Sequence, residues 1–268
     1  MPKALLTTMT KDKEKQYLQH EHNITVAVND ADFHREIKPG AIMGFFQDIA
    51  VDHAEMLGFG SAEMRARNLV WIMARMSFLV SRLPKIGDKL TVRTFPEKPG
   101  AFDVNRGYYI FDKTGSEVIS GSSKWCVLDI NTNKLQRCAP VFEKFDDSEF
   151  IPYPPFEDAN PKIKAAQNTG QTGETPLIFQ VQVTDLDQNF HMNNARYGDV
   201  ILNACGVEML QNNRLARLDV NFISQLFVGD KYEVYKVQKG DTIFIEAKKP
   251  GSDTAVFRAN AEWRKREM

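Results

Sequence analysis

The sequence predicts an α+β fold made of two copies of one unit, each a buried helix followed by a run of antiparallel strands. Apolar residues recur at helical spacing in two separate segments, and each segment is followed by strand-like stretches between Gly- and Pro-containing turns. Short motifs of the first half also return in the second half in the same order, which indicates a duplicated plan. A chain of 268 residues is long enough for two domains.

The first unit is predicted to begin with a short strand at residues 25–28. A helix is predicted over residues 41–57, where Ile42, Phe45, Phe46 and Ile49 share helical spacing, and Gly58 and Gly60 end it. Strands are predicted at residues 70–80, 89–95, 104–111 and 117–128. Strict alternation in the first of these strands would place the following residues on one face: Val70, Ile72, Ala74, Met76, Phe78 and Val80.

The second unit repeats this order. A strand is predicted at residues 179–183, a helix at 194–211, and further strands at 216–223, 231–237, 242–247 and 255–263. The tripeptide Gly87-Asp88-Lys89 recurs at residues 229–231, and Asp30-x-Asp32 recurs as Asp185-x-Asp187.

A sheet wrapped around one central helix is the plan of the hotdog fold, so two such units predict a double hotdog with helices that are apolar nearly all round. We expect an N-terminal hotdog domain at residues 20–138 and a C-terminal one at 176–266. The Pro-rich residues 139–175 are expected to form a partly extended linker between them.

Composition excludes several classes of partner. The net charge of -1 gives no field that would attract nucleic acid, and no stretch approaches the ~20 apolar residues that cross a membrane. Three widely spaced cysteines fit a reducing cytoplasm, and the polar, Lys-rich residues 1–19 lack the apolar core of a secretory signal. The histidines have no metal-ligand spacing, so we expect no metal and no cofactor.

The densest polar cluster, residues 185–194, lies where a predicted strand ends and the second helix begins. A helix N-terminus offers backbone N–H groups that stabilise an oxygen becoming anionic. Asp187, Asn189 and His191 add a carboxylate, an amide and an imidazole, which suits hydrolysis of a thioester. The same residues are common in turns, and Asn193 or Asn194 is expected to cap the helix, so the residues alone leave both interpretations open.

From about residue 25 to 263 the chain resembles the acyl-ACP thioesterases of plants and bacteria, where ACP is acyl carrier protein. The C-terminal half carries the pattern D-x-D-x-N-x-H-x-N-N, and the N-terminal half carries similar segments at residues 58–61, 68–72 and 87–88. The resemblance implies hydrolysis of fatty acyl-ACP thioesters, with release of free fatty acid and an end to chain elongation. It also implies that acyl-phosphopantetheine on the carrier protein is the partner, and that Asp187, Asn189 and His191 are catalytic.

The chain departs from that family at two positions on the strand expected after the second helix. Gln225 stands where the family has Glu, and Leu226 stands where plant members often have Cys. A Cys–His mechanism cannot use Leu226, so we expect Cys126, Cys138 and Cys205 to be dispensable. The base then has to be Asp187 or His191, with Gln225 orienting water; direct attack by Asp187 through an anhydride stays open.

Other features allow more than one interpretation. The aromatic and Met-rich residues Phe45, Phe46, Trp71, Met73 and Met76 fit a plain core or the acyl-chain tunnel that the resemblance implies. A basic group fits a solvated face or a dock for the acidic carrier: Arg214, Arg217, Arg264, Lys265 and Arg266.

The rival functions are an acyl-CoA thioesterase on the same fold, a non-catalytic acyl-binding module, and a dehydratase. The dehydratase is disfavoured because the second helix offers Asp199 and Glu208 but no His. A homodimer is left open, as is the acyl chain length.

Overall fold

The computed structural model describes residues 18–165 and 175–266. Residues 166–174 of the predicted linker and most of the polar N-terminal segment, residues 1–17, lie outside the described residues.

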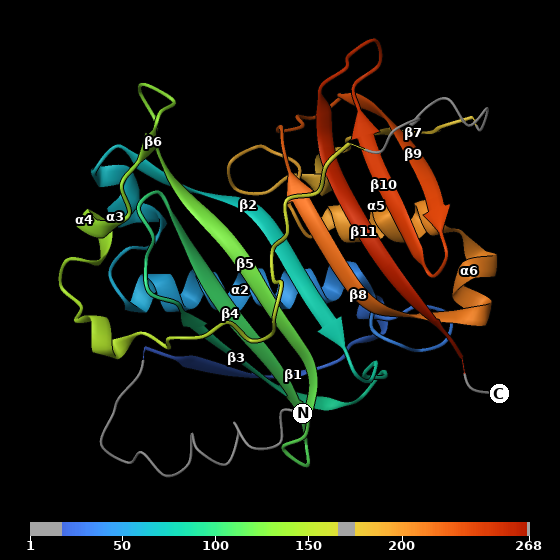
Figure 1. The fold of residues 1–268 in the computed structure, drawn as a ribbon, viewed down its shortest axis with the longest axis horizontal. Coiled ribbons are helices and arrows are strands. Elements are labelled where there is room, and N and C mark those ends of the chain that lie inside the picture. Colours follow the sequence, from blue (N-terminus) through green and yellow to red (C-terminus); the bar gives the residue numbers. More distant parts are fainter. Residues whose placement is uncertain (1–17, 166–174, 267–268) are drawn as a thin grey trace.

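One antiparallel sheet of eleven strands runs through both halves of the described chain (Figure 1). Its main path is β1-β3-β4-β5-β2-β8-β11-β10-β9-β7, with β6 added beside β5. The strands of the first half are β1 His20–Thr25, β2 Leu69–Val80, β3 Lys89–Pro96, β4 Asp103–Asp112, β5 Glu117–Asp129 and β6 Leu135–Gln136. Those of the second half are β7 Leu177–Gln180, β8 Asn213–Phe222, β9 Lys231–Lys239, β10 Thr242–Lys248 and β11 Ala255–Lys265.

The halves join edge to edge through β2 and β8, from Arg75 opposite Asn221 to Leu79 opposite Arg217. The helices are α2 Pro39–Met56, α3 Ser61–Ala66, α4 Ala139–Phe142, α5 Arg196–Cys205 and α6 Val207–Asn212. Short 3-10 turns lie at Val28–Asp30, Asp147–Glu149 and Val183–Asp185. Two units of helix and antiparallel sheet, as predicted, are therefore confirmed.

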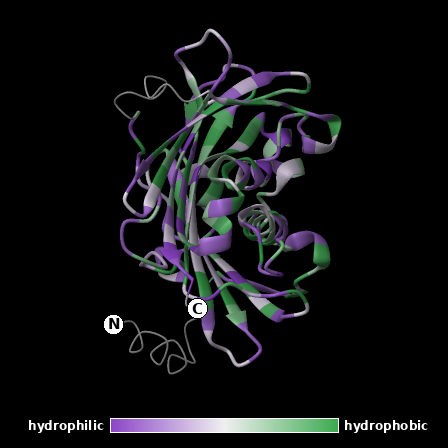
Figure 2. Cartoon of the chain, turned by 90° about the vertical axis from the view of Figure 1, so that its right-hand side faces the viewer, coloured by the Kyte–Doolittle hydropathy of each residue, from purple (hydrophilic) through white to green (hydrophobic). Residues whose placement is uncertain are grey.

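Both long helices lie on the same side of the curved sheet (Figure 2). The sheet covers only the inward side of α2, so Asp48, Val51 and Asp52 on its other side are exposed. The expectation that the helices would be apolar nearly all round was wrong for the outer side of α2, because the sheet covers only one side of that helix.

The predicted helix over residues 194–211 is two helices. Gly206 has a φ of 86°, a left-handed conformation open to glycine, and it ends α5 and starts α6. The predicted strands 25–28 and 179–183 are also displaced, since β1 ends at Thr25, β7 ends at Gln180, and each is followed by a 3-10 turn.

A β-bulge changes the face of β2. The pairing of β2 with β5 shifts between Met73 and Arg75, so the alternation of side chains changes phase there. Met73 is 4% exposed and takes the inward place that strict alternation predicted for Ile72 and Ala74. The predicted set of inward residues is therefore right from Met76 onward and wrong before it.

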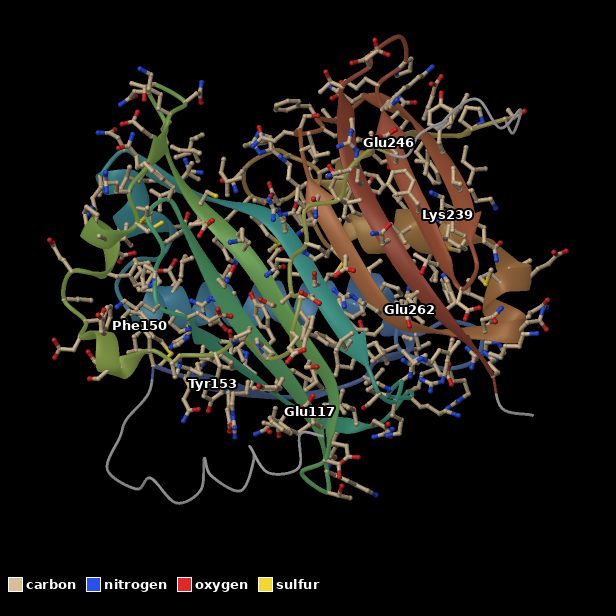
Figure 3. All side chains as sticks on the ribbon, in the orientation of Figure 1. Glu117, Phe150, Tyr153, Lys239, Glu246 and Glu262 are labelled. Atoms are coloured by element: carbon tan, nitrogen blue, oxygen red, sulfur yellow. The ribbon has the colours of Figure 1, made fainter. Side chains whose placement is uncertain are left out.

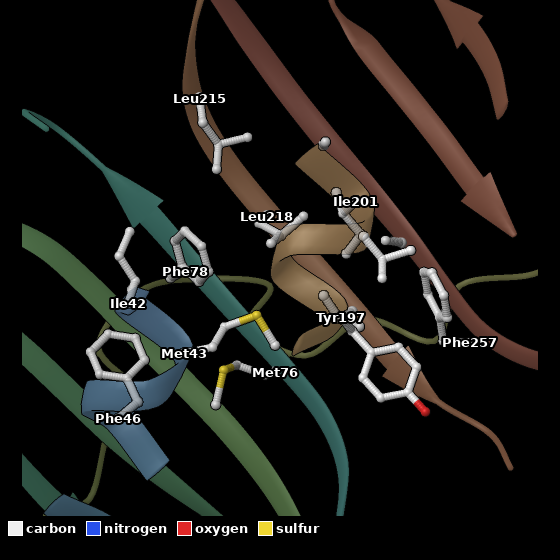
Figure 4. Packing of buried hydrophobic residues seen from close by; sticks show 14 of the residues in the cluster. Ile42, Met43, Phe46, Met76, Phe78, Tyr197, Ile201, Leu215, Leu218 and Phe257 are labelled. Atoms are coloured by element: carbon white, nitrogen blue, oxygen red, sulfur yellow. The ribbon is translucent and has the colours of Figure 1, made fainter. Parts of the chain in front are cut away.

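One cluster of buried side chains spans both halves (Figure 4), and a second cluster around Phe59 and Phe142 lies in the first half. Phe46 of α2 stacks on Tyr108 of β4 with ring centroids 4.4 Å apart and meets Phe78 of β2 edge-on. Tyr197 of α5 packs edge-on against Phe257 of β11 in the second half. The two helices are in close contact at Gly40 and Gly198, where a Cβ atom on Gly198 would lie 2.5 Å from the Gly40 nitrogen.

The segment after β6 crosses the outward face of the sheet (Figure 1). Arg75 donates to the carbonyl of Asn160 at 3.0 Å, and Arg217 donates to the carbonyl of Asp158 at 2.8 Å. Glu246 of β10, labelled in Figure 3, is paired on this face: its carboxylate contacts Arg258 at 2.6 Å and Lys248 at 3.2 Å.

Candidate active site

The polar cluster at residues 185–194 forms a closed turn between β7 and α5. Asp187 Oδ1 accepts the backbone N–H groups of Asn189 at 2.8 Å and His191 at 3.2 Å, and the Asp187 N–H donates to the His191 carbonyl at 2.8 Å. Phe190 at the tip has a φ of 62°. One oxygen of Asp187 therefore holds the turn together, while Oδ2 accepts no hydrogen bond among the described residues.

The first half contains the same turn. Asp32 Oδ1 accepts the N–H groups of His34 at 2.8 Å and Glu36 at 3.1 Å, and the Asp32 N–H donates to the Glu36 carbonyl at 2.8 Å. Arg35 has a φ of 64°, which matches Phe190. The duplication thus extends to individual hydrogen bonds, and the turn geometry by itself does not make a site.

One backbone donor distinguishes the two turns. Between Met192 and Gly198, every N–H donates to a protein oxygen except that of Asn194, which has no acceptor among the described residues. The matching position in the first half is Pro39, which has no N–H. The predicted group of free N–H donors at this helix start is therefore a single donor, because Asn193 accepts the Ala195 N–H at 2.8 Å and the chain turns into α5 at Arg196.

A cavity of about 1080 Å³ joins this turn to the N-terminal half. Its wall includes all four predicted catalytic positions, Asp187, Asn189, His191 and Gln225, together with Asn194. The first half contributes mainly apolar side chains, among them Ala50, Ala54, Phe59, Met64, Trp71, Met73, Val104, Trp125 and Phe142. A polar turn and an apolar pocket are thus parts of one space.

Only two of the five predicted tunnel residues, Trp71 and Met73, line that cavity. Phe46 and Met76 are 0% and 1% exposed and pack in the core, and Phe45 packs against the same core. These three residues face the closely packed part of the interior, so the plain-core interpretation holds for them.

Gln225 lies in the loop after β8 and is exposed, not on the strand as expected. The strand ends at Phe222, which leaves Gln225 free to reach the cavity wall. Leu226 is 0% exposed and its carbonyl accepts the Met192 N–H at 2.8 Å, so this position has a structural role.

Arg65 of α3 was not found from the sequence. Its Nη2 donates to Asn189 Oδ1 at 2.5 Å across 124 residues of chain. With Oδ1 occupied, the Asn189 amide presents its NH₂ group as the free donor. No local pattern marks Arg65, because its partner belongs to the other half.

The cysteines lie outside the cavity wall. Burial raises the pKa of Cys138 to about 11 and the pKa of Cys205 to about 12, and it also raises the pKa of Cys126. All three thiols are unpaired and protonated near neutral pH.

The predicted basic group is partly held by internal partners. Arg217 pairs with Asp219 at 2.8 Å, and Arg266 pairs with Glu36 of the first turn at 2.8 Å. Arg264 lies 3.8 Å from Glu262, and 64% of its side chain is exposed. None of these residues lines the cavity. A carrier-protein dock on this face stays a prediction.

Among residues 18–165 and 175–266, no three His, Cys, Asp or Glu side chains are grouped in a way that would hold a metal ion. No helix in the described part of the chain has the length and apolar character needed to span a membrane.

Comparison with known proteins gives one consistent family. Residues 17–144 match the family model of the acyl-ACP thioesterase N-terminal domain, and residues 169–265 match that of the C-terminal domain. A palmitoyl-acyl carrier protein thioesterase of Cuphea hookeriana is 30% identical over 193 residues, which is 68% of this chain and 45% of the relative. The chain spans about half the length of the curated relatives it matches.

Two solved structures share the whole architecture. An acyl-ACP thioesterase from Bacteroides thetaiotaomicron has a TM-score of 0.83 at 22% identity and covers 92% of this chain and 98% of its own. The 12:0-ACP thioesterase of Umbellularia californica has a TM-score of 0.82 at 21% identity, and the match covers 93% of this chain and 98% of that thioesterase. At these identities the likeness confirms the double hotdog fold.

Proposed function

Because the chain belongs to the acyl-ACP thioesterase family, we propose that it hydrolyses fatty acyl-ACP thioesters, releasing free fatty acid and ending chain elongation. The observation that carries this proposal is the single cavity in which Asp187, Asn189 and His191 meet an apolar pocket from the other half. An acyl chain needs such a pocket, and its thioester needs the polar groups at the entrance of the pocket.

The two halves divide these tasks. The N-terminal hotdog, residues 20–138, holds the acyl chain, and the C-terminal hotdog, residues 176–266, carries the reacting groups, with residues 139–175 as the linker. The apolar cavity wall from the first half and the polar turn from the second support this division.

In the proposed reaction, water attacks the thioester carbonyl carbon, the C–S bond breaks, and the phosphopantetheine thiol leaves with a proton. Asp187 and His191 are the groups of the turn that line the cavity and can accept the proton of water. The Asn189 NH₂ and the Asn194 N–H, at the positive end of α5, are the donors for the carbonyl oxygen. Gln225 has no proton-accepting group of suitable basicity and orients water.

No hydrogen bond joins the Asp187 carboxylate to the His191 ring among the described residues; the ring instead lies edge-on to Phe227 at 4.9 Å. The two groups therefore act on the substrate or on water separately in this arrangement. Direct attack of Asp187 on the carbonyl, with water then opening the anhydride, is the alternative for the same geometry.

The test is an assay of purified protein with acyl-ACP thioesters of graded chain length and with matched CoA thioesters, following release of free thiol. The proposal expects the carrier-protein thioester to be hydrolysed with the higher kcat/KM. A higher kcat/KM for the CoA thioester would identify an acyl-CoA thioesterase, and binding without release of thiol would identify an acyl-binding module. On this proposal the protein acts in the cytoplasm on carrier-bound substrate, in keeping with its three unpaired thiols.

A further inference from the structure

The cavity wall contains a buried guanidinium that the proposed reaction does not use. Arg106 of β4 is 6% exposed, points to the inward side of the sheet and lines the same cavity as the polar turn. Across the sheet, Arg106 pairs with Ser123 of β5. Ser123 pairs with Met76 of β2, and Met76 pairs with Val220 of β8. Three strand spacings separate Arg106 from β8, which is roughly 14 Å across the sheet.

The partners of Arg106 hold it without neutralising it. Its Nη1 donates to His53 Nδ1 at 3.0 Å and to Thr94 Oγ1 at 3.3 Å. Burial lowers the pKa of His53 to about 3, so this ring is neutral and accepts through Nδ1. The Thr94 hydroxyl donates its own hydrogen to the Gly107 carbonyl at 3.0 Å and is left as an acceptor.

No carboxylate lies within ion-pair distance of Arg106 in the part of the chain that the structure describes. Its Nε and Nη2 donors also have no acceptor there. A guanidinium stays protonated at any physiological pH, and a buried charge without a partner is costly. A wholly hydrocarbon chain would leave that charge unpaired, whereas a ligand oxygen would satisfy it.

We propose that Arg106, held by His53 and Thr94, binds an oxygen substituent on the acyl chain far from the thioester, and that a terminal carboxylate is the best ligand. The inference rests on the proposed thioester hydrolysis and narrows its substrate to chains that carry an oxygen function. The planar fork of the guanidinium matches both oxygens of a carboxylate, and the apolar side chains of the cavity wall, among them Trp71, Met73 and Val104, would contact the methylene groups.

The test compares pairs of acyl-ACP thioesters of equal length, one ending in a methyl group and the other in a carboxylate, over a series of lengths. At the length that reaches Arg106, the wild type is expected to favour the carboxylate-ended chain by roughly tenfold or more in kcat/KM. Arg106→Met should abolish this preference, and Arg106→Lys should leave part of it. Arg93→Met is the matched control, because Arg93 lies on the neighbouring strand β3, pairs with Glu21 and is absent from the cavity wall.

A second measurement keeps this inference separate from the hydrolysis proposal. Free dicarboxylic acids should raise the melting temperature of the wild type and of Arg93→Met more than monocarboxylic acids of equal length, and should not do so for Arg106→Met. Methyl-ended chains preferred at every length, or a dicarboxylate preference that survives Arg106→Met, would overturn the inference. If Arg106→Met does not fold, the wild type and Arg106→Lys decide by the same two readouts. Dicarboxylate binding with no hydrolysis of any thioester would refute the thioesterase and leave the binding site standing.

Discussion

Asp187 and Asp32 accept the same two backbone hydrogen bonds in their respective turns, yet only Asp187 lines the cavity. Each aspartate can therefore serve as the structural control for the other. Any effect that comes from the turn alone should appear in both Asp187→Ala and Asp32→Ala. Any effect of the carboxylate on the substrate should appear only in Asp187→Ala.

We expect Asp187→Ala to lower kcat by at least about 100-fold, as loss of a general base does. Asp32→Ala should lower the free energy of unfolding by a similar amount, about 1–3 kcal/mol from the lost hydrogen bonds, without a comparable loss of kcat.

His191→Ala should also lower kcat on the order of 100-fold. Gln225→Ala should cost less than either, and Gln225→Glu should be tolerated or beneficial. Steady-state kinetics and chemical denaturation measure the two effects; near wild-type turnover of Asp187→Ala with an inactive Gln225→Ala would move the working group to the loop after β8.

Arg65 acts through Asn189, so its effect should fall on the chemical step. Arg65→Met frees the Asn189 amide to rotate, and we expect kcat to fall by roughly tenfold with little change in KM, as for partial loss of one hydrogen-bond donor to the carbonyl. Arg67→Met is a suitable control, because Arg67 is two residues further along the chain and donates to the Pro140 carbonyl instead. Equal losses in the two variants would mean that Arg65 has only a structural role.

The cysteines should be dispensable. Burial raises the pKa of Cys138 and Cys205 to about 11 and about 12, so at neutral pH neither forms the thiolate that a nucleophile requires. A variant with Cys126, Cys138 and Cys205 all changed to Ala or Ser should keep most of its turnover in the thiol-release assay. Loss of turnover in a triple variant that still melts cooperatively would reveal a thiol nucleophile.

At the scale of elements, the contact between α2 and α5 depends on the absence of a side chain. A Cβ atom on Gly198 would lie 2.5 Å from the nitrogen and 2.7 Å from the Cα of Gly40, both backbone atoms that have no freedom to move away alone. We expect Gly198→Ala to push the helices apart and to lower the free energy of unfolding by about 1–3 kcal/mol. Asn194 lies just before the start of α5, so turnover should fall as well.

Gly44 of α2 provides the control for that variant. A Cβ atom there would meet only the Ala195 Cβ at 4.0 Å, an ordinary contact. Because alanine favours a helix over glycine by up to about 1 kcal/mol, Gly44→Ala should be neutral or stabilising in the same denaturation experiment. If the free energy of unfolding falls equally in Gly198→Ala and Gly44→Ala, tight helix packing at Gly198 is not the cause.

For the molecule as a unit, the two halves share one sheet and a common core cluster. The ladder between β2 and β8 continues the sheet across the boundary, and the same buried cluster includes Phe78 of the first half and Phe257 of the second. We therefore expect a single cooperative transition in calorimetry, with equal calorimetric and van't Hoff enthalpies. Two resolved transitions would show that the halves are independent folding units.

Features that depend on neighbouring residues could be predicted from the amino-acid order alone. The helix predicted at residues 41–57 is α2 at Pro39–Met56, and the strands around the glycine turns lie within a few residues of their predicted positions. The grouping of Asp187, Asn189 and His191 was visible as well, because a turn of a few residues brings them onto one short segment. Periodicity, turn residues and local hydrogen bonds act over a few residues, so a single sequence carries them.

Which of these groups line the same cavity depends instead on contacts between segments far apart in the chain. The bulge in β2 that turns Met73 inward arises from pairing with β5, and the contact of Arg65 with Asn189 bridges 124 residues. The same holds for Arg106, whose buried charge becomes meaningful only where β4 faces α2 and the cavity. Strand register, helix packing and cavity shape are set by contacts between distant segments, and their energies depend on distances that the order of residues along the chain does not contain.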